Sequence, residues 1–197
     1  VELSNFYLDI IKARLYCYET DGLARRSAQT ALYLILDTIT KIMAPILCFT
    51  GDEIWLAMPH KAGDDDRNVL FNDMNGVFAD YALSADEMAK WEKIIEVRDA
   101  VNGALETARA EKKIGKSLEA KVTIPAARLT GARQVSMEEL ADLLIVSQVE
   151  VSGEADEIRV ESAAGVKCPR CWNHSEHIGA DGHHNQLCDR CAAVVGE

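Results

Sequence analysis

Four cysteines near the end of the chain form two closely spaced pairs, Cys168 with Cys171 and Cys188 with Cys191. Two residues separate the cysteines within each pair, and sixteen residues separate the pairs. This spacing is typical of a zinc ribbon, in which each Cys-x-x-Cys turn presents both sulfurs to one tetrahedral ion. Four thiolates leave no coordination position open for water. The pattern therefore predicts one structural Zn²⁺ and no catalytic metal.

Other uses of these cysteines are less favoured. The N-terminus lacks the layout of a signal peptide and no apolar run is long enough to span a membrane, so we expect a reducing, cytoplasmic location. Paired cysteines in that setting favour metal over disulfides or a redox dithiol. Histidines between the pairs leave open a site of three thiolates and one imidazole: His174, His177, His183 and His184. Cys17 and Cys48 lie in apolar surroundings and are expected to be small buried hydrophobic residues.

Composition indicates a globular chain with few options for non-specific binding. The 197 residues are 48% hydrophobic, which is enough for a core, and the formal net charge is −11. This charge repels phosphate backbones and anionic membranes, so any nucleic-acid contact must be local. The sequence contains no nucleophile elbow, Walker motif or other glycine-rich phosphate loop. We therefore predict no catalytic residue within the chain.

The first two-thirds of the chain has helical periodicity. Apolar residues at three-and-four spacing predict helices over about 4–18, 23–47 and 84–115, with a shorter helix before Pro59. The second helix is expected to be mostly buried and to break near Pro45. Capping boxes are predicted at Thr50, Ser84 and Ser136. Long helices joined by short connections predict an antiparallel bundle.

The pattern then changes to one typical of strands. Residues alternate with a period of two over 120–125, 149–151 and 157–161, and a short helix over 136–144 lies between the first two segments. We predict a mainly α chain with a helical bundle at 1–117, a small α/β module at 118–164 and a zinc ribbon at 165–197. Because the last segment has few apolar residues, zinc binding is expected to supply its folding free energy.

Basic residues gather where the long helix is predicted to end: Arg109, Lys112, Lys113, Lys116 and Lys121. Two interpretations fit them equally, a phosphate contact or the favourable placement of cations at a helix C-terminus. Arg25 and Arg26 lie at the start of the second helix. Cations are disfavoured there by the helix dipole, which favours a functional reason for them.

Several motifs resemble the C-terminal region of bacterial isoleucyl-tRNA synthetases. They are Phe-Tyr-Leu-Asp-Ile-Ile-Lys-Ala-Arg-Leu-Tyr at 6–16, Arg-Arg-Ser-Ala-Gln-Thr at 25–30, Ala-Pro-Ile with Asp-Glu-Ile-Trp within 44–55, and Lys-Ile-Gly-Lys-Ser-Leu-Glu-Ala at 113–120. The last is the most particular to isoleucyl enzymes, whereas the motifs of 44–55 are shared with valyl enzymes. The ribbon resembles the terminal zinc finger of that family, a type shared with some DNA glycosylases.

The resemblance implies that a helical anticodon-binding bundle, an α/β junction module and a zinc ribbon hold isoleucine tRNA. It also implies that ATP is used only in an upstream catalytic domain. The His-Ile-Gly-His and Lys-Met-Ser-Lys-Ser signatures of that domain have no counterpart here. Since the chain begins at Val1 without Met, we expect a fragment that contacts upstream domains of its own polypeptide. We expect a cytoplasmic monomer with no membrane or DNA partner.

The same resemblance moves the basic residues towards a role in tRNA binding. Candidates for contacts to the tRNA backbone are Arg14, Arg25, Arg26, Lys112, Lys113 and Lys116, and candidates on the ribbon are Arg170, Trp172 and Arg190. Trp172 either stacks on a base or covers the metal site. Rival hypotheses are a zinc-containing protein-interaction module, the equivalent region of a valyl enzyme and, less favoured, a DNA-repair module.

Overall fold

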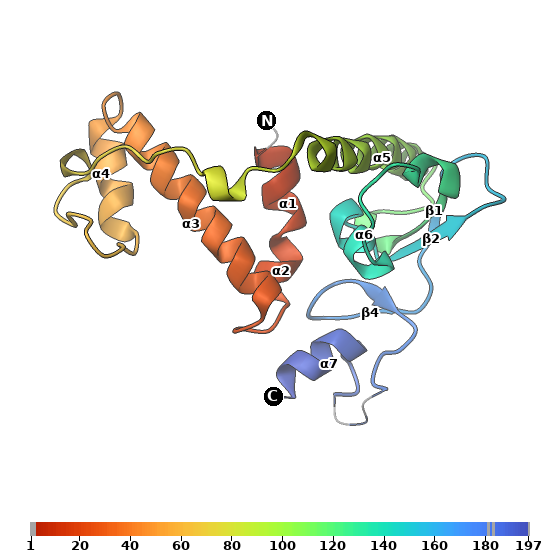
Figure 1. Ribbon diagram of the computed structural model, residues 1–197. Coiled ribbons are helices and arrows are strands. Elements are labelled where there is room, and N and C mark those ends of the chain that lie inside the picture. Colours follow the sequence, from red (N-terminus) through yellow and green to blue (C-terminus); the bar gives the residue numbers. More distant parts are fainter. Residues whose placement is uncertain (1–2, 181, 183, 197) are drawn as a thin grey trace. The chain divides into compact units, whose positions relative to one another are not determined.

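The computed structural model describes residues 3–180, 182 and 184–196 and contains helices, a small sheet and a C-terminal ribbon (Figure 1). The α-helices are α1 Leu8–Ile10, α2 Lys12–Tyr16, α3 Leu23–Met43, α4 Cys48–Ala57, α5 Ala85–Ala110, α6 Met137–Leu144 and α7 Asp189–Val195. The strands are β1 Ala120–Pro125, β2 Gln148–Ser152, β3 Arg159–Ser162, β4 Val166–Lys167 and β5 His174–Ser175. The predicted fold class is confirmed. No helix among the described residues is both long and apolar enough to cross a membrane.

The chain divides into two compact units. The smaller unit is the continuous segment Thr20–Ala82, and the larger unit combines the residues up to Glu19 with those from Leu83 onward. The larger unit therefore brings the N-terminal helical segment together with the sheet and the ribbon. The division of the chain into the three domains 1–117, 118–164 and 165–197 stays a prediction.

In the smaller unit, α3 and α4 meet through the turn at Pro45. Met43 ends α3, and Leu47 N–H donates to the Met43 carbonyl at 2.8 Å, so α4 begins at once with Cys48. The capping box predicted at Thr50 is therefore wrong, since Thr50 already lies inside α4. A buried cluster of Ala44, Trp55 and Val69 joins the turn, α4 and the loop that follows.

The expectation that α3 is mostly buried is also wrong. Its buried residues are Ala28, Asp37, Thr40 and Lys41, whereas large apolar side chains of α3 are exposed, Ile42 at 55%. The physical reason lies in what covers the helix. The loop after α4 packs on the side that carries Asp37 and Lys41, through Lys61 and Asn75. That side is polar, so hydrophobic periodicity alone points to the wrong face.

In the larger unit, α5 begins as predicted and ends earlier. Ser84 Oγ accepts a hydrogen bond from Glu87 N–H at 3.2 Å, which confirms the cap at this end. The helix ends at Ala110, and Lys112 adopts the left-handed conformation with φ 60°. Lys113 N–H then donates to the Ala108 carbonyl at 2.9 Å, as in a Schellman-type ending. The predicted end near Gly115 is therefore wrong, because a lysine takes the usual place of glycine.

The main core lies between α5, the sheet and α6. Strand β1 is central, with β2 parallel on one side and β3 antiparallel on the other, so Val122 lies opposite Val149 and Val160. Helix α6 is the crossover between β1 and β2, and Ser136 caps it through Glu139 N–H at 3.1 Å. The buried core residues are Val97, Val101, Leu105, Ala108, Ile114, Ala120, Val122, Ile124, Leu140, Leu144, Val146 and Val160.

The buried face of α5 is mostly apolar. Ile94, Val101, Leu105 and Ala108 are buried, whereas Met88 and Ile95 are exposed. Arg98 also lies on this face. Its Nε donates to the Leu143 carbonyl at 3.1 Å, which places a charged residue in the buried stripe that an apolar pattern does not reveal.

Candidate metal centre and nucleic-acid interface

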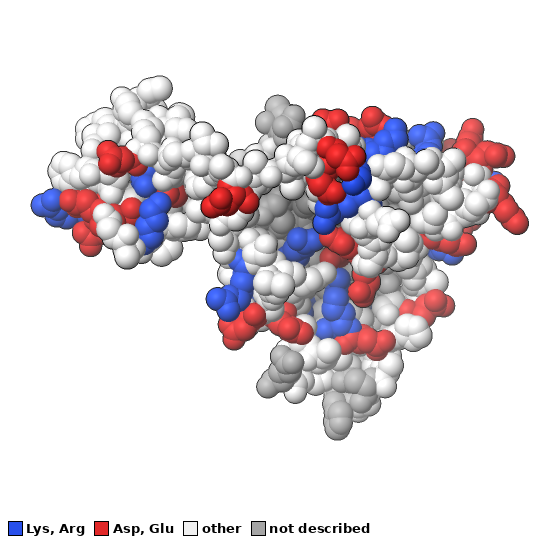
Figure 2. All heavy atoms as spheres, in the orientation of Figure 1, with Lys and Arg blue, Asp and Glu red and all other residues white. Residues whose placement is uncertain are grey.

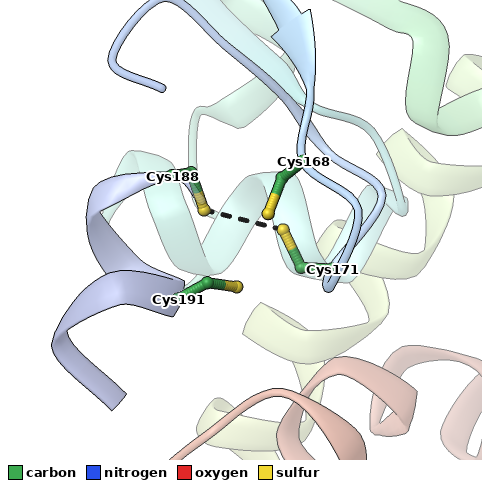
Figure 3. A group of neighbouring side chains, drawn as sticks. All are labelled: Cys168, Cys171, Cys188 and Cys191. Carbon is green, nitrogen blue, oxygen red and sulfur yellow. Dashed lines mark hydrogen bonds between the residues drawn. The ribbon is translucent and has the colours of Figure 1, made fainter. Parts of the chain in front are cut away.

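The four cysteines come from two tight turns of the ribbon. Cys168 and Cys171 follow β4, where Trp172 N–H donates to the Cys168 carbonyl at 2.9 Å and Trp172 takes the left-handed conformation with φ 68°. Cys188 is the residue before α7, and Cys191 lies in the first turn of that helix. Figure 3 shows the four side chains pointing toward one another from these two turns.

The positions of the sulfurs fit a tetrahedral zinc ion. All four Sγ atoms lie within 4.8 Å of one another, and those of Cys171 and Cys188 are 3.7 Å apart. A Zn–S bond of about 2.3 Å places ligand sulfurs about 3.8 Å apart in a tetrahedron. Among the described residues, which exclude His183, this is the group that could hold a metal, and no histidine is part of it. The predicted structural zinc is confirmed.

The ionisation of these thiols also calls for a cation. Burial opposes ionisation of Cys168, but hydrogen bonds from the backbone N–H groups of Cys171, Cys188 and Arg170 outweigh it and lower the pKa of Cys168 to about 6. Burial raises the pKa of Cys188 and of Cys191, and the nearby sulfur of Cys171 adds to both rises. Four thiolates are therefore stable together only around a positive ion.

Arg170 and Arg190, both predicted to contact tRNA, have partners within the larger unit. Arg170 Nη1 donates to the Cys17 carbonyl at 2.6 Å and to Cys191 Sγ at 3.5 Å. Arg190 Nη1 lies 3.4 Å from Asp142 Oδ1, and its guanidinium lies over the Tyr18 ring at 5.4 Å. These guanidinium groups connect the ribbon to the end of the N-terminal helical segment and to α6.

Tyr18 is held in the same cluster. Its hydroxyl donates to Asp142 Oδ2 at 2.5 Å. Burial raises the pKa of Tyr18 to about 12, and the hydrogen bond to Asp142 adds to the rise. Tyr18 therefore stays protonated and remains a donor across the physiological pH range.

A cavity of about 550 Å³ lies beside the ribbon, within the larger unit. It is lined by α2, the end of α6 and the turn after Cys171, including Tyr16, Ile145 and Trp172. Tyr16 is 75% exposed and Trp172 is 57% exposed, and Lys167 Nζ lies 5.3 Å from the centre of the Trp172 ring. Tyr16 was not among the residues predicted to contact tRNA. The available signal was an aromatic residue at the end of a helix that carries Lys12 and Arg14.

The lysines after α5 lie on one ordered loop. Lys112, Lys113 and Lys116 are exposed, while Ile114 is buried in the main core. Glu119 Oε2 accepts from Gly115 N–H at 2.8 Å and from Lys116 N–H at 3.2 Å. Lys113 pairs with Glu111, but Lys112 and Lys116 have no ion pair among the described residues. We call residues 112–116 the lysine loop.

The other arginines predicted to contact tRNA lie at separate positions in the fold. Arg14 lies 3.7 Å from Glu139 in the larger unit. Arg25 and Arg26 begin α3 in the smaller unit, where Arg26 is exposed and Arg25 Nε is buried without a hydrogen-bond partner. Figure 2 shows basic and acidic side chains interspersed on the face that it draws.

Comparison with known proteins matches two segments of the chain to described families. Residues 1–124 match the family model described as the anticodon-binding domain of tRNA ligase, and residues 165–194 match a zinc finger found in FPG and IleRS. Curated relatives include isoleucine–tRNA ligases of Syntrophotalea carbinolica, at 43% identity, and of Staphylococcus haemolyticus and Staphylococcus aureus, each at 46%. These matches cover 99% of this chain but 22% of each relative. The chain belongs to the family of anticodon-binding domains of tRNA ligases, and it carries the associated zinc finger.

Proposed function

We propose that this chain holds isoleucine tRNA for a ligase whose ATP-dependent aminoacylation takes place elsewhere in a longer polypeptide. The choice of isoleucine is supported by the 43–46% identity to isoleucine–tRNA ligases. A role within the parent polypeptide is supported by the match to about a fifth of each relative's length. A cytoplasmic, monomeric state is part of the proposal.

The observation that carries the proposal is the cavity beside the ribbon, with exposed aromatic rings of Tyr16 and Trp172 in its lining. Proteins read single-stranded RNA loops mainly by stacking splayed bases on aromatic rings. Lys167 covers part of the Trp172 ring, and the rest of this half-exposed ring is available to a base. Asn173 also lines the cavity and offers an amide to a base edge.

The lysine loop is the best candidate for contacts to the tRNA backbone. Lys112 and Lys116 have no intramolecular ion pair among the described residues, so a phosphate need not displace a partner. Arg14, Arg170 and Arg190 are weaker candidates, since each already has an intramolecular partner. Exposed Arg26 is the better candidate of the two arginines on α3.

Fluorescence anisotropy with labelled isoleucine and valine tRNAs, over a series of salt concentrations, tests the proposal. We expect tighter binding of isoleucine tRNA and a logarithmic salt slope of several units, because each phosphate contact contributes roughly −0.7 to −0.9. Lys112→Gln with Lys116→Gln should reduce the magnitude of that slope by about 1.4 to 1.8. Trp172→Ala should weaken binding by about 1–3 kcal/mol and leave the slope unchanged.

Lys93→Gln is the matched control, since Lys93 is a half-exposed lysine of the same unit that pairs with Glu96. It should change neither affinity nor slope. No binding at low salt, or a slope near zero, would contradict the proposal and favour a protein partner. Equal affinity for the two tRNAs would retain tRNA binding but reject isoleucine specificity.

A further inference from the structure

The two cysteine turns of the ribbon share one feature besides their cysteines. Each has an arginine directly before its second cysteine, in the sequences Cys168-Pro-Arg-Cys171 and Cys188-Asp-Arg-Cys191. Both arginines are half-buried, and the side chain of Arg190 is 23% exposed. Burial of a guanidinium is costly unless anions and hydrogen-bond acceptors surround it.

Arg170 also reaches a sulfur of the other turn. Its Nη1 lies 3.5 Å from Cys191 Sγ. A Zn²⁺ ion with four thiolates carries a net charge of −2, since four negative charges exceed two positive ones. Two guanidinium groups match that charge. The ion also joins the two turns, so its loss frees both arginines from their places beside the sulfurs.

The same arginines contact two consecutive residues that lie far from the ribbon in the sequence. Arg170 donates to the carbonyl of Cys17 at 2.6 Å, and the Cys17 thiol lies 3.9 Å from the Arg170 carbonyl. Arg190 lies over the ring of Tyr18, and both side chains reach Asp142 of α6. The end of the N-terminal helical segment is therefore attached to the zinc centre by one arginine from each turn.

We propose that Arg170 and Arg190 are positioning residues that make the docking of residues 12–18 on the ribbon depend on zinc. The ion holds the two cysteine turns in place, and each turn positions its arginine. Cys17, Tyr18 and Asp142 are held through these arginines. The proposal goes beyond RNA binding, because it concerns order within the larger unit in the absence of any tRNA.

Hydrogen–deuterium exchange read by mass spectrometry tests this coupling on the whole chain. In the unaltered protein, removal of zinc with a chelator should speed exchange over residues 12–18 by roughly tenfold or more, while β1 stays protected. The double variant Arg170→Gln/Arg190→Gln is first shown by elemental analysis to hold one zinc per chain. Exchange over residues 12–18 of this variant should be fast even before zinc is removed. Chelation should then add less than about twofold.

Arg133→Gln is the matched control, because Arg133 makes the same pair of contacts away from the ribbon, an ion pair with Glu87 at 2.8 Å and a contact over Trp91 at 5.3 Å. It should leave exchange over 12–18 unchanged. If the double variant binds zinc poorly, Asp142→Asn gives the same test from outside the cysteine turns. Unchanged exchange on chelation, or full protection in the zinc-loaded double variant, would overturn the proposal.

Discussion

At the scale of single residues, the smaller unit depends on one buried carboxylate. Asp37 on α3 is fully buried, with Lys41 Nζ 3.0 Å from Oδ1 and Lys61 Nζ 3.1 Å from Oδ2. Asn75 Nδ2 donates to the same carboxylate at 2.9 Å. Lys41 is itself buried and lies 5.2 Å from the centre of the Trp55 ring. The carboxylate thus joins α3 to the loop after α4.

Asp37→Ala should lower the free energy of unfolding of the smaller unit by about 3–5 kcal/mol, because it leaves the Lys41 ammonium buried without its partner. Urea unfolding at pH 7 measures the loss. Asp80→Ala, which removes an exposed carboxylate of the same unit, is the control and should cost less than about 0.5 kcal/mol. A similar cost for both variants would mean that the Asp37 network adds little to stability.

This contribution should also depend on pH. Burial favours the neutral acid, but hydrogen bonds from Asn75, Lys41 and Lys61 outweigh burial and hold the pKa of Asp37 below its ordinary value. The stabilisation is therefore present above about pH 4, the range of an unfolded aspartate, and is lost as pH falls through the lower folded value. The difference between the unaltered protein and Asp37→Ala should narrow below pH 4.

At the scale of elements, local sequence signals predicted helix caps and the ribbon correctly where no neighbouring segment imposed another constraint. Ser84 and Ser136 cap their helices as predicted, and the spacing of the cysteines was enough to predict the ribbon. Thr50 has an equally good capping sequence, yet the hydrogen-bonded turn at Pro45 starts α4 before it. The capping residue is the one at which the chain enters the helix. Tertiary structure determines where that entry lies.

The ribbon itself has a backbone position that only glycine fits. Gly165 has φ +84°, and a Cβ there would lie 2.2 Å from the carbonyl of Ser175, on the strand paired with β4. Gly165→Ala should therefore weaken zinc affinity at least tenfold, measured by competition with a chelator, because binding and folding of the ribbon are coupled. Gly153→Ala, where no atom lies within 4 Å of the added Cβ, should leave zinc affinity unchanged. Equal affinities would mean that the β4–β5 pair is not needed for metal binding.

At the scale of the whole molecule, contacts between distant parts of the chain were beyond prediction from the sequence. Arg170 and Arg190 were expected to contact tRNA because the ribbon resembles the terminal zinc finger of isoleucyl-tRNA synthetases. Their partners Cys17 and Asp142 lie 153 and 48 residues away along the chain. The buried face of α3 was mispredicted for the same reason, because its partners are polar residues of a later loop.

The two units are stabilised by different interactions and should respond separately to different changes. The larger unit contains the main core and the zinc centre, and the smaller unit contains the Asp37 network. Calorimetry should resolve two transitions. Chelation, or Cys188→Ala, should lower the midpoint of the larger unit alone, and Asp37→Ala should lower that of the smaller unit alone. Cys48 is exposed, so the expectation that it is buried is wrong. Cys48→Ala should leave the zinc content unchanged. If chelation shifts both transitions together, the units unfold as one cooperative body and their stabilities cannot be assigned separately.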